Sequence, residues 1–178
     1  LVTQMHWGGG TPTYLEPRQI DALFNAIVTR FMVPAEGAEI SVEVDPRVTT
    51  LAHLQTLRSL GFNRLSIGIQ DFDMQVQEAI GRNQDEKMAT ELYLYCRQEQ
   101  FISINFDLIY GLPGQTIDSF NKTMEKVVNL RPDRIALYSF AYLPEGKSHQ
   151  KKINMSIMPS AETKFALFNL ARKMFSEG

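Results

Sequence analysis

The sequence predicts an α/β fold built on a parallel sheet, and two patterns carry that prediction. Short apolar or β-branched runs alternate with longer segments of helical periodicity, and the alternation gives five consecutive strand–helix units. Such units form a parallel sheet with right-handed crossovers, either doubly wound or curled into a barrel. The chain has 178 residues, 44% of them hydrophobic, so we expect one domain over 1–178.

Each strand is predicted from an apolar or β-branched run, and each helix from apolar residues three and four positions apart. The first helix has Ile20, Leu23, Phe24, Ile27 and Phe31 on one face. Gly61 is expected to follow the second helix as its C′ residue, Gly81 to interrupt the third helical stretch, and Ser160 to be the N-cap of the last helix. The expected strands are 1–7, 38–45, 64–70, 101–111 and 134–142, and the expected helices are 17–31, 51–60, 73–80, 86–99, a segment around 120–128 and one that begins after Pro159–Ser160.

Composition excludes several functional classes. The net charge is −2 and no run of Lys or Arg is present, so we expect neither nucleic acid nor a membrane surface as partner. No apolar stretch reaches the roughly 18 residues of a membrane span. Cys96 is the only cysteine, which excludes an internal disulfide and favours a reducing compartment, the cytoplasm. The chain begins inside a strand-like run at Leu1, and we expect it to be a piece of a longer protein.

Polar residues and glycines gather where the predicted strands end. The first strand ends in Gly8-Gly9-Gly10, the second contains Glu43, the third ends in Gln70-Asp71, and the fourth contains Asp107. The carboxyl ends of parallel strands meet at one edge of the sheet, where α/β enzymes carry their sites. We therefore expect the functional site at this edge.

The glycine triplet has two interpretations. A turn with positive φ needs one or two glycines, whereas a third glycine favours close approach of a ligand to the backbone. Neither G-x-x-x-x-G-K-[ST] nor G-x-G-x-x-G is present, and Pro12 removes an amide that an anion nest would use. A nucleotide phosphate is therefore not the expected ligand.

The charged candidates also have structural alternatives. Glu43 and Asp45 could be paired acid/base carboxylates or metal ligands, although Asp45 before Pro46 also suits a capping role. Asp107 lies in an apolar run and should pair with an Arg, a Lys or a ligand, and Arg82 is a candidate for an anionic ligand group or a surface residue. The histidines, His6, His53 and His149, lack zinc spacing, and we expect no metal ligand in this chain.

Five motifs give the chain a family resemblance. They are "HWGGGTPTYL", "SVEVDPR", "GFNRLSIGIQDFDMQVQEAIGRNQ", "NFDLIYGLPGQT" and "PDRIALYSFAYLP", in this order over residues 4 to 144. The sequence resembles the oxygen-independent coproporphyrinogen III oxidases, which are radical S-adenosylmethionine (SAM) enzymes. The resemblance implies a partial (β/α) barrel of the radical-SAM type, of which five strand–helix units are present. It also implies oxidative decarboxylation of two propionate side chains of coproporphyrinogen III, which gives protoporphyrinogen IX.

The resemblance implies two bound SAM molecules and a [4Fe–4S] cluster. Gly9, Gly10 and Thr11 match the stretch that contacts the methionyl ends of the cofactors, and Glu43 matches a residue at the cluster-bound SAM. The positions that mainly line the second SAM are Gln70, Arg82, Asp107 and Ala141. The implied partners are a porphyrinogen substrate and a small electron-donor protein or reductant.

One feature departs from the family pattern. The family holds its cluster with C-x3-C-x2-C upstream of the glycine triplet, and this chain contains only Cys96. The cluster ligands are thus expected outside this chain, and the chain alone is expected to be inactive. Three other readings stay open: the haem chaperone of the same family, which hands on haem, a non-catalytic barrel-like binding module, and a barrel enzyme of unrelated chemistry.

Overall fold

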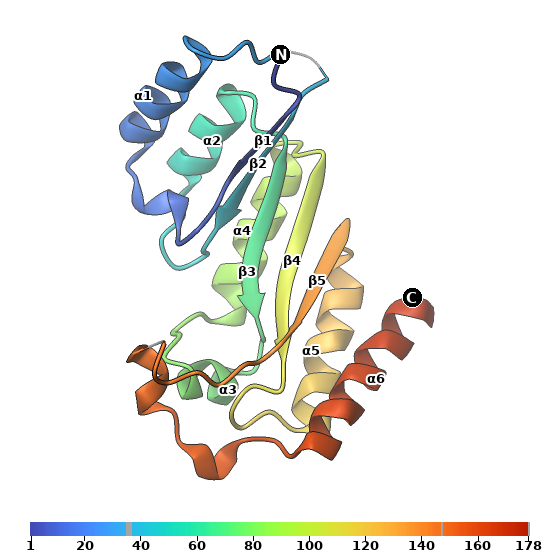
Figure 1. Ribbon diagram of the computed structural model, residues 1–178. Helices are drawn as coiled ribbons and strands as arrows, with labels where there is room; N and C mark the ends of the chain where they lie inside the picture. The colour runs from blue at the N-terminus through green and yellow to red at the C-terminus, as the bar shows by residue number, and fades with distance from the viewer. Residues whose placement is uncertain (35–36, 147, 178) are drawn as a thin grey trace. The chain divides into compact units, whose positions relative to one another are not determined.

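Five strands alternate with helices in the computed structural model, which describes residues 1–34, 37–146 and 148–177 (Figure 1). The sheet has the strand order β1-β2-β3-β4-β5, so strands that follow one another in the chain are neighbours. β1 pairs with β2, and β2 with β3, in parallel, which confirms the expected α/β class. The strands are β1 (Gln4–Trp7), β2 (Glu39–Val44), β3 (Arg64–Gln70), β4 (Ser103–Tyr110) and β5 (Arg134–Ser139). The helices are α1 (Pro17–Val28), α2 (Leu51–Ser59), α3 (Met74–Ala79), α4 (Glu86–Gln98), α5 (Ile117–Leu130) and α6 (Ala161–Glu177), with 3-10 turns η1 (Pro12–Tyr14), η2 (Ser148–Lys152) and η3 (Met155–Ile157).

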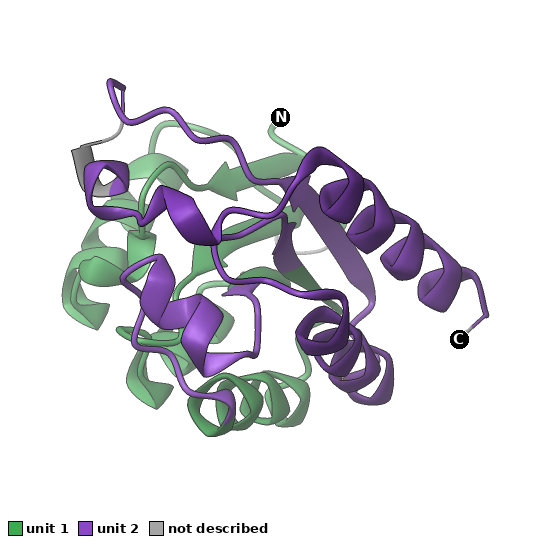
Figure 2. Cartoon of the chain, turned by 90° about the horizontal axis from the view of Figure 1, so that it is seen from below, with its two compact units in different colours: residues 1–68, 87–106 green, residues 69–86, 107–178 purple. Residues whose placement is uncertain are grey.

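The chain forms two compact units (Figure 2). Unit 1 comprises residues 1–68 and 87–106, and unit 2 comprises residues 69–86 and 107–178. The boundary between them falls inside β3 and β4. That the whole chain is one domain stays a prediction.

The core of unit 1 lies between the sheet and its helices. Trp7 of β1 packs against Phe62 with ring centroids 5.0 Å apart, and Phe24 of α1 lies 5.6 Å from Phe62. Leu54 of α2 and Val42 of β2 are also fully buried, and Val42 is the strand-register partner of Trp7. Burial of such side chains contributes about 1.5–3 kcal/mol each, so this face fixes the positions of β1 and β2.

The other face of the sheet in unit 1 is polar. In β2 the side chains of Val42 and Val44 are buried, whereas Ser41 and Glu43 alternate with them on the opposite face. On the same face Asn105 of β4 donates to the hydroxyl of Ser66 in β3 over 2.8 Å. Parallel strands covered on both faces are usually apolar throughout, so this alternation indicates that the polar face lines a site.

The helices of unit 2 pack through one apolar face each. α5 and α6 lie side by side (Figure 1), and Phe120, Met124 and Leu167 are fully buried. The Ser160 hydroxyl accepts a hydrogen bond from the Thr163 amide, which confirms the expected start of α6.

Two helix ends test the predicted boundaries. Gly61 follows α2 with a φ of +92°, as expected of a C′ glycine. The first helix, however, ends at Val28 and not at residue 31, because Thr29 is its C-cap and its hydroxyl donates to the Ala26 carbonyl. Phe31 is consequently outside the helix and 56% exposed.

Within the residues that the structure describes, no helix is long and apolar enough to cross a membrane.

Candidate functional site

The three glycines after β1 meet different surroundings. Gly9 and Gly10 have φ values of +83° and +114°, and a Cβ on either would meet no heavy atom within 4 Å. A Cβ on Gly8, in contrast, would lie 2.6 Å from His6 Nε2 and 2.7 Å from Glu43 Oε1. Gly9 and Gly10 thus leave open space above the backbone, whereas Gly8 makes room for two side chains of the chain itself.

Glu43 joins the triplet to the neighbouring strand. Its Oε2 accepts the Gly9 amide over 3.3 Å, and its Oε1 lies 3.3 Å from His6 Nε2. The Glu43 side chain is 40% exposed. The structure therefore brings Gly9 and Glu43 together, as the sequence predicts, and places His6 beside them, which sequence reasoning missed.

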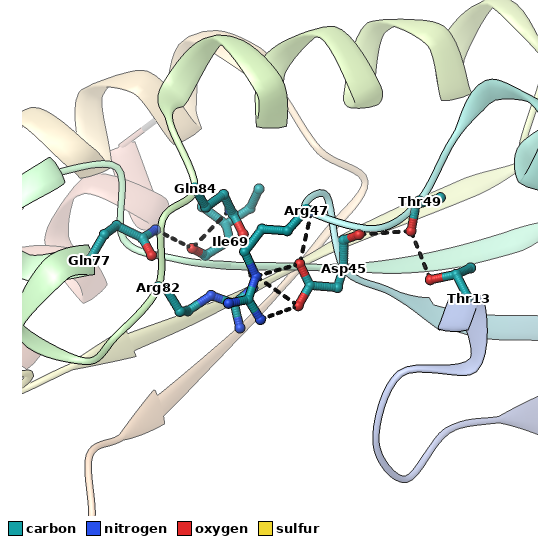
Figure 3. Close-up of polar contacts among 8 residues, drawn as sticks. All are labelled: Thr13, Asp45, Arg47, Thr49, Ile69, Gln77, Arg82 and Gln84. Carbon is teal, nitrogen blue, oxygen red and sulfur yellow. Dashed lines mark hydrogen bonds and ion pairs between the residues drawn. The ribbon is translucent and has the colours of Figure 1, made fainter. Parts of the chain in front are cut away.

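A buried chain of threonines fixes the backbone beyond the triplet. The Thr13 and Thr49 hydroxyls lie 2.8 Å apart, and Thr49 donates to the Asp45 carbonyl over 2.8 Å (Figure 3). Thr13 is only 2% exposed, so this contact ties the loop after β1 to the loop after β2. Thr11, just before η1, lines a cavity of about 380 Å³ together with Trp7 and Gly9.

Asp45 serves a local role. Its Oδ1 accepts the backbone amide and Nε of Arg47, both over 3.0 Å, and its Oδ2 accepts Nη2 over 2.7 Å (Figure 3). The hydrogen bond to Asp45 raises the pKa of the Arg47 guanidinium. Asp45 is 7% exposed, and its carboxylate organises its own turn. The expectation that it caps the next helix is wrong, because Thr50 is the N-cap of α2.

In unit 2, Gln70 is the last residue of β3 and has an unusual backbone conformation. Its φ is +67°, and the Asp71 amide donates back to the Ile69 carbonyl over 2.9 Å, which makes a γ-turn of the rare positive-φ kind. A residue held in such a conformation costs roughly 1–3 kcal/mol and persists only where its surroundings enforce it. Strain of this kind concentrates at functional sites.

Two buried glutamines hold the backbone at Gln70 in this conformation. The Ile69 carbonyl also accepts Nε2 of Gln77 over 3.0 Å and Nε2 of Gln84 over 3.4 Å (Figure 3). Arg82 donates to Gln84 Oε1 over 2.9 Å, so Gln70 and Arg82 are held by one network. Gln77 and Gln84 are 0% and 2% exposed, and sequence reasoning missed both because a lone Gln carries no signal of burial.

Asp71, next to Gln70, is buried and accepts several hydrogen bonds through its carboxylate. Its carboxylate accepts the Asp73 amide over 2.8 Å, the Thr123 hydroxyl over 2.6 Å and Gln115 Nε2 over 2.5 Å. Gln115 Oε1 in turn accepts the Gly111 amide, which links the ends of β3 and β4. Burial raises the pKa of the Asp71 carboxyl against the opposing effect of these donors.

The last two predicted positions lie in β4 and after β5. Asp107 stands between Phe106 and Leu108, which are fully buried, so its partly exposed side chain lies on the opposite face of β4. The Ala141 carbonyl accepts Nε2 of Gln150 over 3.0 Å. Gln150 is 4% exposed, and it fixes the backbone at Ala141.

The described residues offer no metal centre: no group of three His, Cys, Asp or Glu side chains among them could hold a metal ion. His53 belongs to the N-terminal cap of α2, where its Nδ1 contacts Thr50, and its Nε2 lies 3.0 Å from the Leu15 carbonyl. The side chain of His149 lies outside the described residues. Burial raises the pKa of the Cys96 thiol to about 12, and the residue is fully buried.

The site in unit 1 fits the amino-acid end of SAM. A zwitterionic amino acid needs an acceptor for its ammonium and close access to the backbone, and Glu43 and the open side of Gly9–Gly10 provide these. The four positions Gly9, Gly10, Thr11 and Glu43 all lie in unit 1, and the other four predicted positions lie in unit 2. The chain contains one cysteine, and it does not fit a [4Fe–4S] cluster by itself.

Known proteins resemble this chain in sequence and in structure. The oxygen-independent coproporphyrinogen III oxidase of Synechocystis is 49% identical over 93% of this chain and 35% of that protein, and that of Escherichia coli K12 is 47% identical over 92% and 35%. The chain thus spans about a third of the length of these relatives. The solved structure of HemN, the coproporphyrinogen III oxidase of Escherichia coli, matches with a TM-score of 0.95 at 44% identity over 99% of this chain and 40% of that one.

More distant similarity concerns the fold alone. An archaeal Elp3 matches with a TM-score of 0.76 at 16% identity over 94% of this chain.

The sequence pattern of the Radical SAM superfamily covers residues 1–127. Together with the parallel sheet and its strand order, these matches confirm the expected partial barrel, and the chain belongs to the radical SAM superfamily.

Proposed function

We propose that the protein containing this chain is an oxygen-independent coproporphyrinogen III oxidase, which converts two propionate side chains of coproporphyrinogen III to vinyl groups. The observation that carries the proposal is the identity of 49% over 93% of the chain to a relative of that name. A similarity that covers nearly the whole chain includes the residues at the ends of all five strands, where the chemistry of this fold takes place.

In this proposal the residues of unit 1 bind the amino-acid end of SAM. Glu43 accepts the ammonium group, and the space above Gly9 and Gly10 admits the methionyl chain at backbone distance. When bound, SAM and the reduced cluster would supply a 5′-deoxyadenosyl radical for hydrogen abstraction from the propionate; loss of CO₂ would then leave the vinyl group and pass one electron to an acceptor outside this chain. The protein contributes position, because Thr13 and Thr49 hold the loops that carry these contacts.

The residues of unit 2 are proposed to bind a second SAM. Arg82 suits a carboxylate, Asp107 a ribose hydroxyl or an ammonium, and Ala141 the flat edge of an adenine. The hydrogen bonds of Gln77 and Gln84 to the Ile69 carbonyl and of Gln150 to the Ala141 carbonyl support this proposal, since they hold the backbone at two of the predicted ligand positions.

The remaining partners follow from the reaction. A small electron-donor protein or another reductant reduces the cluster, whose ligands are proposed to lie outside these 178 residues. The single buried thiol suits the reducing cytoplasm. The 178-residue chain by itself is proposed to be inactive for lack of cluster ligands.

The test is anaerobic reconstitution of the complete gene product with iron and sulfide, followed by an assay with a chemical reductant for the cluster and an electron acceptor. We expect it to cleave SAM to 5′-deoxyadenosine and to form protoporphyrinogen IX from coproporphyrinogen III, measured by liquid chromatography. SAM cleavage without porphyrinogen turnover would contradict the proposal that coproporphyrinogen III is the substrate. Absence of SAM cleavage in the reconstituted protein would contradict the proposal that the protein is a radical SAM enzyme.

A further inference from the structure

His6 lies beside the proposed SAM-binding residues of unit 1, and the proposed function gives it no role. It lies on the polar face of the sheet, directly opposite Ser41 of β2 in the strand register. Its Nδ1 is 2.8 Å from the Ser41 hydroxyl, and its Nε2 is 3.3 Å from Glu43 Oε1. The imidazole therefore bridges two residues of β2 from the neighbouring strand.

The chemistry of the partners defines which ring nitrogen carries a proton. A carboxylate oxygen only accepts hydrogen bonds, so Nε2 must be the N–H that donates to Glu43. The Ser41 hydroxyl can donate to Nδ1, or it can donate to the Met5 carbonyl, 3.3 Å away, and accept from a protonated Nδ1. In both arrangements the ring is fixed at its two ends and Nε2 points its proton at Glu43.

The Glu43 carboxylate is thereby held from two sides. Oε1 receives His6 Nε2, and Oε2 receives the Gly9 amide over 3.3 Å. Gly8 lies beneath this contact, and a Cβ there would come within 2.6 Å of His6 Nε2. The absence of a side chain at Gly8 is explained by the His6–Glu43 pair alone.

We infer that His6 is a positioning residue, which orients the Glu43 carboxylate above Gly9 so that its remaining acceptor sites face the ammonium of SAM. The inference rests on the proposed function of Glu43. A glutamate in a half-exposed position samples several rotamers, and fixing it in the bound geometry before the ligand arrives raises affinity. His6 acts through Glu43 and does not itself contact the ligand.

The test compares SAM affinity across a double-mutant cycle in the complete gene product, reconstituted with its cluster, by equilibrium dialysis. His6→Ala is expected to weaken SAM binding about fivefold, the effect of one hydrogen bond. His6→Gln keeps an N–H at similar reach and should recover most of the loss. In a Glu43→Gln background, His6→Ala should have no further effect, because the group that it positions is gone.

The matched control is Gln4→Ala. Gln4 lies two residues before His6 on the same face of β1 and donates to Glu39 of β2 over 3.4 Å. It therefore forms the same kind of cross-strand pair two residues farther from the glycine triplet. This variant should bind SAM as the wild type does. An equal His6→Ala penalty in the wild-type and Glu43→Gln backgrounds, or no penalty in the wild type, would overturn the inference.

A second measurement does not depend on SAM. Hydrogen exchange of the peptide that contains Gly9, followed by mass spectrometry, should be faster in His6→Ala than in the wild type or in Gln4→Ala. Unchanged exchange would overturn the positioning role. If the wild type fails to bind SAM, the proposed function falls, while the exchange rates still decide whether His6 holds Glu43 over Gly9.

Discussion

Gly8→Ala separates the binding role of the triplet from its structural role. The new Cβ would lie 2.6 Å from His6 Nε2 and 2.7 Å from Glu43 Oε1, and restoring an ordinary 3.4 Å contact requires a displacement of about 0.8 Å. The His6–Glu43 and Gly9–Glu43 hydrogen bonds, each 3.3 Å long, would not survive a shift of that size. The atoms in the way are the ends of flexible side chains, so the fold can accommodate the change.

The expected effects on stability and on binding therefore differ. Loss of partly exposed hydrogen bonds costs about 0.5 kcal/mol, and replacing glycine where the backbone permits alanine returns a similar amount. We expect the free energy of unfolding, measured with urea, to change by less than about 1 kcal/mol. A misplaced carboxylate loses a charge-assisted bond of about 1.5–3 kcal/mol, which weakens SAM binding about tenfold or more in equilibrium dialysis.

The matched control is Gly146→Ala, where the nearest atom to a new Cβ, the Leu143 carbonyl oxygen, is 3.9 Å away. That variant should bind SAM normally. Wild-type affinity in Gly8→Ala would refute the role given to the carboxylate.

Three further perturbations test the sites of unit 2 and the buried thiol. Burial raises the pKa of Asp71 above its unfolded value near 3.9, so the stability that it contributes is present at lower pH and declines as pH rises through the folded pKa. The difference in unfolding free energy between wild type and Asp71→Asn should accordingly fall as the pH rises above about 4; a difference that grows with pH would contradict this. Gln70→Gly should relieve the positive-φ strain and stabilise the protein by about 0.5 kcal/mol while it weakens binding of a second SAM, as measured by binding stoichiometry. Cys96, buried and with a pKa of about 12, should resist iodoacetamide at pH 8 until the protein is unfolded in urea; labelling of the native chain, seen by mass spectrometry, would show that the thiol is accessible.

The fold could be predicted from the sequence because periodicity reports burial directly. Ile40, Val42 and Val44 alternate with polar residues in β2, and Phe120, Met124 and Val127 recur at helical spacing in α5, and all six are buried. The end of the first helix was harder to predict, since Leu23 and Phe31 look like members of its apolar face and both are exposed. Local capping at Thr29 decided that boundary.

The site could be predicted only in part. Gly9 and Glu43 stand out as a glycine and a charge at strand ends, and the structure brings them together. His6 was missed because its role depends on strand register, which pairs it with Ser41 and sets it beside Glu43. The γ-turn at Gln70 left no trace in the sequence either, since glutamine has no preference for positive φ.

The central claim is that Glu43 and the glycine triplet hold the amino-acid end of SAM, and Glu43→Gln tests it most directly. The dissociation constants of S-adenosylhomocysteine and 5′-methylthioadenosine, which share the adenosine but differ in the amino-acid end, are measured for wild type and variant. We predict that Glu43→Gln weakens S-adenosylhomocysteine binding about tenfold and leaves 5′-methylthioadenosine binding unchanged. An equal loss for both ligands, or no loss for S-adenosylhomocysteine, would contradict the account.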